Sequence, residues 1–131
     1  MNITQIKHQF QFGGDDAETD DLAHKTLKGE KTATSSLYEY YLLGLKNMSK
    51  VGDLAAVLDS SGKEICRVRI NRIEIVDFKD ITEEFACEEG DGSLDNWLKI
   101  HIPFYTEQLS LTDKRLTPDT KLVCEWFGLI N

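Results

Sequence analysis

Residues Glu64–Val76 read EICRVRINRIEIV, and this stretch decides the fold because its alternation of apolar and polar residues changes phase halfway. The apolar residues divide by parity into two groups: Cys66, Val68 and Ile70, then Ile73 and Ile75. In a regular strand the two groups would face opposite sides of the sheet. A β-bulge near Asn71-Arg72 would return them to one face. Since bulged strands bend strongly, this stretch favours a small closed barrel over a flat sheet.

Three other segments have the patterns of strands. Leu54–Leu58 and the turn Asp59–Gly62 predict a hairpin with the bulged strand. Lys31–Ser36 is rich in small and β-branched residues, which is typical of a short strand. Lys121–Ile130 is apolar on both parities and therefore predicts a strand that is buried on both sides, as in the centre of a barrel.

Helix signals occupy three segments: Thr19–Lys28, Asp80–Glu88 and a longer segment that begins after Ser93. Gly29 ends the first helix, and Asp80 or Thr82 caps the second. Pro103 should kink or divide the third. The aromatic segment Leu37–Leu45 is a short helix or a turn. About five strands and three helices, with helices inserted between strands, predict an α+β fold.

The composition is that of one globular domain, which we expect over residues 1–131. The chain is 40% apolar and 29% charged. It carries 15 Lys and Arg against 23 Asp and Glu, for a net charge of −8. This charge disfavours a nonspecific coat on DNA or RNA, which rests on phosphate neutralisation. It also disfavours an anionic membrane surface, so we expect neither DNA nor a membrane as partner.

The sequence lacks the signals of a membrane protein, a secreted protein and a metal site. No apolar run approaches the roughly 20 residues of a membrane helix, and Met1–Phe12 lacks the apolar region of a secretory signal, which indicates a cytoplasmic protein. The widely spaced Cys66, Cys87 and Cys124 are interpreted as three buried, reduced thiols. The histidines show no metal-ligand spacing with one another or with a cysteine, so we expect no metal and no cofactor.

Gly29–Thr34, which reads GEKTAT, is the stretch that most clearly suggests a catalytic role. Lys31 and Thr34 have opposite parities, so they converge only if the chain bends or if Lys31 still belongs to the turn. A hydroxyl becomes a good nucleophile when a neighbouring base takes its proton. A lysine serves as that base only if partial burial lowers its pKa. Spacing alone favours the alternative of a surface lysine beside a strand threonine.

An acidic run from Glu83 to Glu89 is followed by Asp91, which lies between two glycines that let the backbone approach a ligand closely. A carboxylate here could orient a lysine or activate a water molecule. Taken by itself, the run is better explained as a solvated helix end followed by a turn.

Two further groups could contact a ligand, and each has a plainer explanation. Trp97 and His101, one helical turn apart, could stack on a nucleobase together with Tyr105, although such aromatic stripes usually form the core face of a helix. Arg67, Arg69 and Arg72 could form a local basic strip, although they are typical of the solvent face of a hairpin balanced by carboxylates.

A series of short segments, in this order, resembles the ASCH-domain family, whose fold is a PUA-like β-barrel. The segments are Phe12–Asp15, Asp21–Ala23, Gly29–Thr34, Val51–Asp53, Ile81–Gly90, Ser93–His101 and Leu122–Phe127. They span nearly the whole chain. The resemblance sharpens the expected fold to an α+β domain with a small PUA-like β-barrel of about five strands and three flanking helices.

The resemblance also implies a ligand and a chemistry. Members of the family are thought to bind RNA or nucleotides in a cleft beside the barrel that contains the GxKxxT-type motif, and some resemble ribonucleases. By analogy with small bacterial members that hydrolyse N4-acetylcytidine, Thr34 would be the nucleophile, Lys31 would activate it, and Glu89 would orient Lys31 or the hydrolytic water. The candidate ligand contacts are Gly29, Ser35, Arg72, Asp91, Trp97 and His101.

Three functions stay open on the sequence. The first is binding of RNA or a modified nucleoside in the cleft, and the net charge of −8 favours a short or single-nucleoside ligand. The second is hydrolysis of an acylated cytidine or a similar amide. The third is a non-catalytic interaction, through Tyr38–Tyr41 or the C-terminal strand, for which a homodimer is one form.

Overall fold

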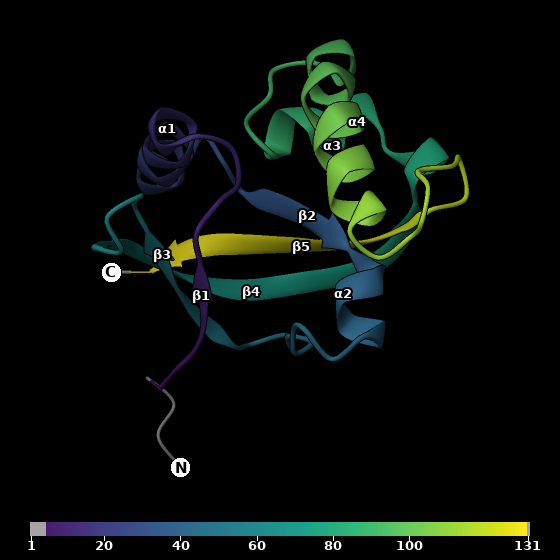
Figure 1. Ribbon diagram of the computed structural model, residues 1–131. Coiled ribbons are helices and arrows are strands. Elements are labelled where there is room, and N and C mark those ends of the chain that lie inside the picture. Colours follow the sequence, from purple (N-terminus) through teal and green to yellow (C-terminus); the bar gives the residue numbers. More distant parts are fainter. Residues whose placement is uncertain (1–4, 131) are drawn as a thin grey trace.

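The computed structural model describes residues 5–130, and a five-stranded mixed sheet lies at its centre (Figure 1). The strands are β1 (Ile6–Phe10), β2 (Ala33–Leu37), β3 (Leu54–Leu58), β4 (Glu64–Asp77) and β5 (Lys121–Ile130). Their order is β1-β3-β4-β5-β2, with β1 parallel to β3 and the other neighbours antiparallel. The expected closure of a barrel is not detected among these residues, because no pairing joins the edge strands β1 and β2.

Within residues 5–130, four α-helices accompany the sheet: α1 (Asp16–Leu27), α2 (Tyr38–Leu42), α3 (Glu83–Glu88) and α4 (Leu94–Ser110). A 3-10 turn, Phe78–Asp80, precedes α3. In Figure 1, α1 lies over one end of the sheet, and α3 and α4 lie over the other end. The α+β class is confirmed, with one helix more than predicted because the aromatic segment after β2 forms a helical turn.

The helix ends follow local chemistry. The side chains of Thr82 and Ser93 each accept a hydrogen bond from the backbone N–H three residues later, so both are N-caps as predicted. Asp15 caps α1 in the same way, which starts this helix earlier than the predicted Thr19. Pro103 lies inside α4 without dividing it, on an exposed part of the helix where water can satisfy the carbonyl that proline leaves free.

The predicted bulge in β4 is present. The register against β5 shifts between Ile70 and Arg72, and beyond the shift Ile73 lies opposite Glu125. Since Ile70 lies opposite Phe127, two residues from Glu125, the bulge keeps both isoleucines on one face of the sheet. Burial decreases along that face, from the fully buried Ile70 to Ile75, which is 47% exposed.

β5 is buried on both faces along Leu122–Glu125, as its sequence pattern predicts. On one face, Leu122 and Cys124 pack against α3 and α4 in a cluster that includes Trp97. On the other face, Phe127 packs with Val68 in a second cluster that extends to α1. The strand therefore separates two hydrophobic clusters.

Two features of the structure differ from the sequence interpretation. β1 was not expected, because Ile6–Phe10 (IKHQF) is short and polar and its parallel partner β3 is far along the chain. Cys66 and Cys124 are buried free thiols as expected, but Cys87 is exposed. Across residues 5–130, no helix has the length and apolar character required to cross a bilayer.

Replacing Leu122 by alanine tests the burial of β5 on the face that packs against α3 and α4. The side chain is fully buried, so Leu122→Ala should lower the free energy of unfolding by about 2–5 kcal/mol. Leu129→Ala is the matched control on the same strand, since Leu129 is 44% exposed; it should change stability by about 0.5 kcal/mol or less. Urea unfolding measures both, and equal losses would contradict this account of the core.

Candidate functional site

A cavity of about 250 Å³ lies between α1 and α4. Its walls come from the loop between β1 and α1, from α1 itself, from the turn before β2, from the segment after α3 and from α4. The sequence-predicted residues that line it are Lys31, Thr34, Ser35, Glu89, Asp91 and His101. The fold thus brings the three expected catalytic residues to a single cavity.

Lys31 is the buried cation of this cavity. Gly29, with a φ of 79°, lies in the turn after α1, and β2 begins only at Ala33, so Lys31 lies in the connection that leads from this turn to the strand. Its residue exposure is 3%, and its ammonium group donates hydrogen bonds to the carbonyl oxygens of Ala33 at 2.7 Å and Glu89 at 3.0 Å. Burial lowers the pKa of Lys31, and the nearby carboxylates of Glu89 and Asp91 oppose this effect.

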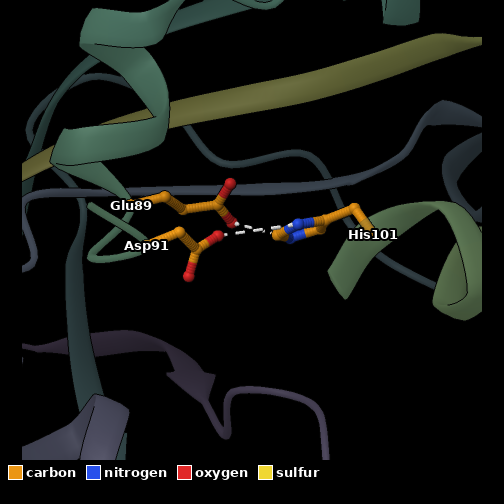
Figure 2. Close-up of side chains that lie close together, drawn as sticks. All are labelled: Glu89, Asp91 and His101. Atoms are coloured by element: carbon orange, nitrogen blue, oxygen red, sulfur yellow. Dashed lines mark ion pairs between the residues drawn. The ribbon is translucent and has the colours of Figure 1, made fainter. Parts of the chain in front are cut away.

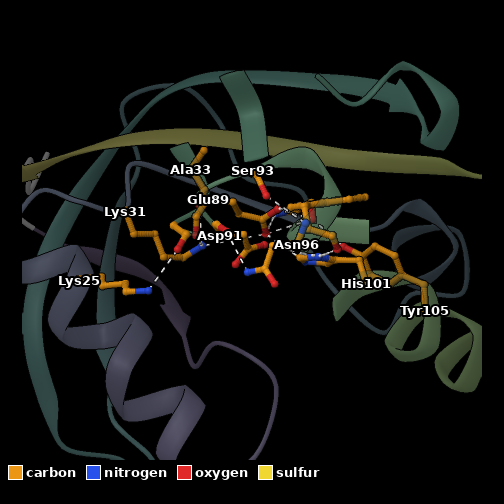
Figure 3. Close-up of polar contacts among 12 residues, drawn as sticks. Lys25, Lys31, Ala33, Glu89, Asp91, Ser93, Asn96, His101 and Tyr105 are labelled. Carbon is orange, nitrogen blue, oxygen red and sulfur yellow. Dashed lines mark hydrogen bonds and ion pairs between the residues drawn. The ribbon is translucent and has the colours of Figure 1, made fainter. Parts of the chain in front are cut away.

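The Glu89 carboxylate, at the C-terminal end of α3, is the acceptor around which the polar groups gather (Figure 3). It accepts hydrogen bonds from the Ser35 backbone N–H at 3.0 Å, from the Ser35 hydroxyl at 3.1 Å and from the Trp97 indole N–H. The Lys31 ammonium lies 4.0 Å from Oε1. Burial alone would raise the pKa of Glu89, but His101, Lys31 and Trp97 favour the carboxylate and hold its pKa at about 2.

Asp91 and His101 extend this network toward the cavity (Figure 2). His101 Nε2 lies 3.6 Å from Glu89 Oε1, and Nδ1 lies 3.6 Å from Asp91 Oδ2. Burial alone would lower the pKa of His101, but the carboxylates of Glu89 and Asp91 raise it. Burial and the charge of Glu89 raise the pKa of Asp91, whose Oδ2 is buried without a hydrogen-bond partner.

Glu89, Asp91 and His101 also form a group with the donor types of a divalent-cation site. One potential ligand atom from each residue lies within 4.8 Å of the others. No sequence spacing indicates this group, because a loop and a separate helix supply its members. The Lys31 ammonium and the donors from Ser35 and Trp97 already engage the Glu89 carboxylate, which weakens its capacity to bind a cation.

The two neighbouring hydroxyls on β2 have different surroundings. Ser35 lies opposite Cys124 in β5, and its hydroxyl contacts both Glu89 and, at 2.6 Å, the Tyr105 hydroxyl. Thr34 lies opposite Glu125 and so faces the other side of the strand, although it also lines the cavity. In the described part of the chain, no hydrogen bond joins the Thr34 hydroxyl to Lys31 or Glu89.

Three candidate ligand contacts do not line this cavity. Arg72 is over the Trp126 ring at 4.3 Å and pairs with Glu74 at 2.6 Å. Trp97 is fully buried, with its ring stacked under His101 at 4.1 Å, so its surface is used by the protein itself. Gly29 shapes the turn that places Lys31.

Two aromatic walls of the cavity, Phe12 and Phe104, went unrecognised in the sequence. Phe12, Phe104 and Tyr105 line it together with His101. The Phe12 ring lies 4.5 Å from the Lys31 ammonium, a cation–π contact. The helical spacing of His101 and Tyr105 was a usable signal, whereas nothing local connects Phe12 to either of them.

Comparisons with known proteins identify close structural relatives. The family model described as ASCH domain matches residues 8–131. The ASCH domain from Lactobacillus crispatus is 30% identical, with a TM-score of 0.87 over 93% of this chain and 78% of that chain. A protein from Enterococcus faecalis is 28% identical, with a TM-score of 0.84 over 94% of this chain and 75% of that chain. None of the curated proteins matches the chain.

The depressed pKa of Glu89 predicts a specific dependence of stability on pH. Its folded pKa of about 2 lies below the ordinary value of 4.5, so the carboxylate stabilises the fold above pH 4.5 and loses this effect as the pH falls toward 2. At pH 7, Glu89→Gln should lower the free energy of unfolding by on the order of 3 kcal/mol.

Urea unfolding at several pH values between 7 and 3 measures this difference, which should shrink steadily below pH 4.5. Glu84→Gln is the control, because Glu84 is an exposed carboxylate on the same helix. A wild-type and Glu89→Gln difference that stays constant across this range would show that the Glu89 charge does not stabilise the fold.

Proposed function

The chain belongs to the ASCH-domain family, and from this premise we propose that it binds a single nucleoside, free or within a short RNA, in the cavity between α1 and α4. The observation that carries the proposal is the meeting of buried polar groups and aromatic walls in one small cavity. Lys31, Glu89 and Asp91 supply the polar groups, and Phe12 and Phe104 supply aromatic surface.

The size and charge of the cavity favour a small ligand. Its volume of about 250 Å³ lies just below the roughly 300–1,000 Å³ of sites for drug-sized molecules. A net charge of −8 disfavours affinity that depends on many phosphate contacts. The acidic Glu18 and Asp21 also line the cavity, alongside Lys25 and Lys31. A neutral base and sugar fit this balance of charges better than a polyphosphate.

The groups at the cavity surface suit a nucleobase. A base can stack on an aromatic ring, and the Phe104 ring is partly exposed beside Gly13. The carboxylate of Asp91, a residue that lines the cavity, can accept a hydrogen bond from an exocyclic amino group. Trp97, which the sequence suggested for stacking, instead supports His101 from below.

Removing the Phe104 ring tests the binding proposal. Loss of a base–ring stack of about 1–3 kcal/mol should weaken nucleoside binding by Phe104→Ala roughly 5- to 150-fold. Isothermal titration with cytidine and N4-acetylcytidine measures the affinities. Ile102→Ala is the control, since Ile102 is on the same helix, is 44% exposed and does not line the cavity.

Salt provides a second measurement on the same samples. Affinity for the nucleoside should change little between 50 and 200 mM salt, because no phosphate is neutralised. Equal affinities of wild type and Phe104→Ala would remove the proposed stacking surface. Steep salt dependence would instead support a longer RNA ligand.

Hydrolysis of an acylated nucleoside is the second candidate function, and the buried Lys31 favours it. Burial promotes the neutral amine of Lys31, which can accept the proton of a hydroxyl as its oxygen attacks an amide carbonyl. The lysine would then return that proton to the departing amine, and water would release the acyl group. By the family resemblance Thr34 supplies the hydroxyl, and Ser35 is the neighbouring alternative.

A screen of acylated nucleosides, including N4-acetylcytidine, tests this chemistry. If Lys31 is the base, Lys31→Ala and Lys31→Met should lower turnover at least about 100-fold. Lys28→Ala, at an exposed position beyond α1, should have no effect. Thr34→Val and Ser35→Ala identify which hydroxyl reacts. Circular dichroism and thermal melting show whether each variant is folded, and full activity of a folded Lys31 variant would eliminate the mechanism.

A further inference from the structure

A second cavity, of about 490 Å³, lies at the open side of the sheet. Residues of both edge strands line it, among them His8 and Phe10 of β1 and Thr34 and Ser36 of β2. The remaining walls come from the loop after β1, from α2 and the loop after it, from α4 and from Glu125 of β5. Because β1 and β2 do not pair in the described part of the chain, the cavity occupies the gap that a closed barrel would eliminate.

Glu125 is the unusual residue of this cavity. It lies in the interior strand β5, opposite Thr34 on one side and Ile73 on the other. Its residue exposure is 3%, and Oε2 is buried without a hydrogen-bond partner. An unpartnered buried polar atom is destabilising and calls for an explanation in a native fold. Burial raises the pKa of Glu125 and the nearby Ser49 hydroxyl opposes this rise, while Oε2 stays available to a donor from a bound ligand.

The other lining groups complement this acceptor. Lys46 lies at the more exposed side of the cavity, with its ammonium 5.7 Å from the centre of the Tyr40 ring. Tyr41 donates to or accepts from the Ser36 hydroxyl at 2.9 Å, which holds its ring in place. The cavity therefore offers one free acceptor, one flexible donor and fixed aromatic surface.

We propose that this cavity is a second binding site, for a planar heterocycle that presents an amino group to Glu125 and a carbonyl oxygen to Lys46. The tyrosine rings provide surface on which such a heterocycle can stack. The inference does not depend on the proposed function of the first cavity, because neither Lys31 nor Glu89 lines the second.

The two sites are neighbours that share a wall. The residues that line both cavities are Phe12, Gly13, Thr34, Ser35, Phe104 and Tyr105. The Phe104 ring approaches Gly13 so closely that a β carbon there would lie 3.0 Å from it. This close contact keeps part of the wall narrow, so ligands in the two sites would lie side by side.

Amide chemical shifts can assign binding to each cavity separately. Cytidine, which has an amino group and a carbonyl group on the two carbons that flank a ring nitrogen, and uridine, which lacks the amino group, are titrated into the full chain labelled with nitrogen-15. Shifts at Ser36, Tyr41 and Glu125 report the second cavity, and shifts at Asp91 and Asn96 report the first. We expect cytidine to bind the second cavity at least 10-fold more tightly than uridine.

Variants of Glu125 test the assigned acceptor. Glu125→Met removes both carboxylate oxygens and should weaken cytidine binding at the second cavity at least 10-fold, with a melting temperature equal to or above that of the wild type. Glu125→Gln keeps more of the polar shape and is the variant to use if methionine disturbs folding; it too should weaken binding. Lys46→Met should weaken binding, whereas Lys50→Met, an exposed lysine that does not line the cavity, should not.

Three results would overturn the proposal: shifts confined to the first cavity, equal affinities for cytidine and uridine in the second, or unchanged affinity in a folded Glu125 variant. Lys31→Met tests binding at the first cavity independently of binding at the second. In that variant, only the ligand-induced shift changes at Asp91 and Asn96 should be altered. Binding at either cavity can therefore be lost while binding at the other is retained.

Discussion

The burial of one ionised carboxylate, that of Glu89, is the constraint on which the rest of the site depends. A charge in this position is tolerated only with compensating donors and cations. Ser35 from β2 and Trp97 from α4 donate to it, and Lys31 and His101 lie near it as cations or potential cations. These contacts tie the end of α3 to β2 and α4. The polar residues in the wall of the first cavity therefore also hold these elements of the fold together.

The open edge of the sheet accounts for the second cavity, which lies on the opposite side of β2. Because the edge strands β1 and β2 do not pair with each other in the described residues, a space is left between them, and the side chains of β5 that face it include Glu125. On β2, the Ser35 hydroxyl therefore contacts the buried carboxylate of Glu89, whereas Thr34 lies opposite Glu125 in β5. Alternation along a single short strand turns the two hydroxyls to opposite faces, although both residues line both cavities.

Much of the local structure was predictable from the sequence because its causes are local. The parity change in β4 indicated the bulge, and the apolar run of β5 indicated burial on both faces. Thr82 and Ser93 marked helix starts through their side-chain oxygens. The segment order also indicated the family, and with it Lys31 and Glu89. By contrast, β1 depends on a parallel partner far along the chain, so its short polar sequence carried little signal.

The sequence by itself determined the α+β class and the positions of most elements, and it left open whether Lys31 lies in a turn or in the strand that follows. Only the tertiary structure decided that this lysine is buried beside Glu89, that Trp97 supports the site from within the core, and that Arg72 lies elsewhere, over Trp126. The physical reason is that caps, bulges and alternation are set by residues within a few positions. Burial, pKa and the walls of a cavity are set by groups that meet only when distant segments pack together.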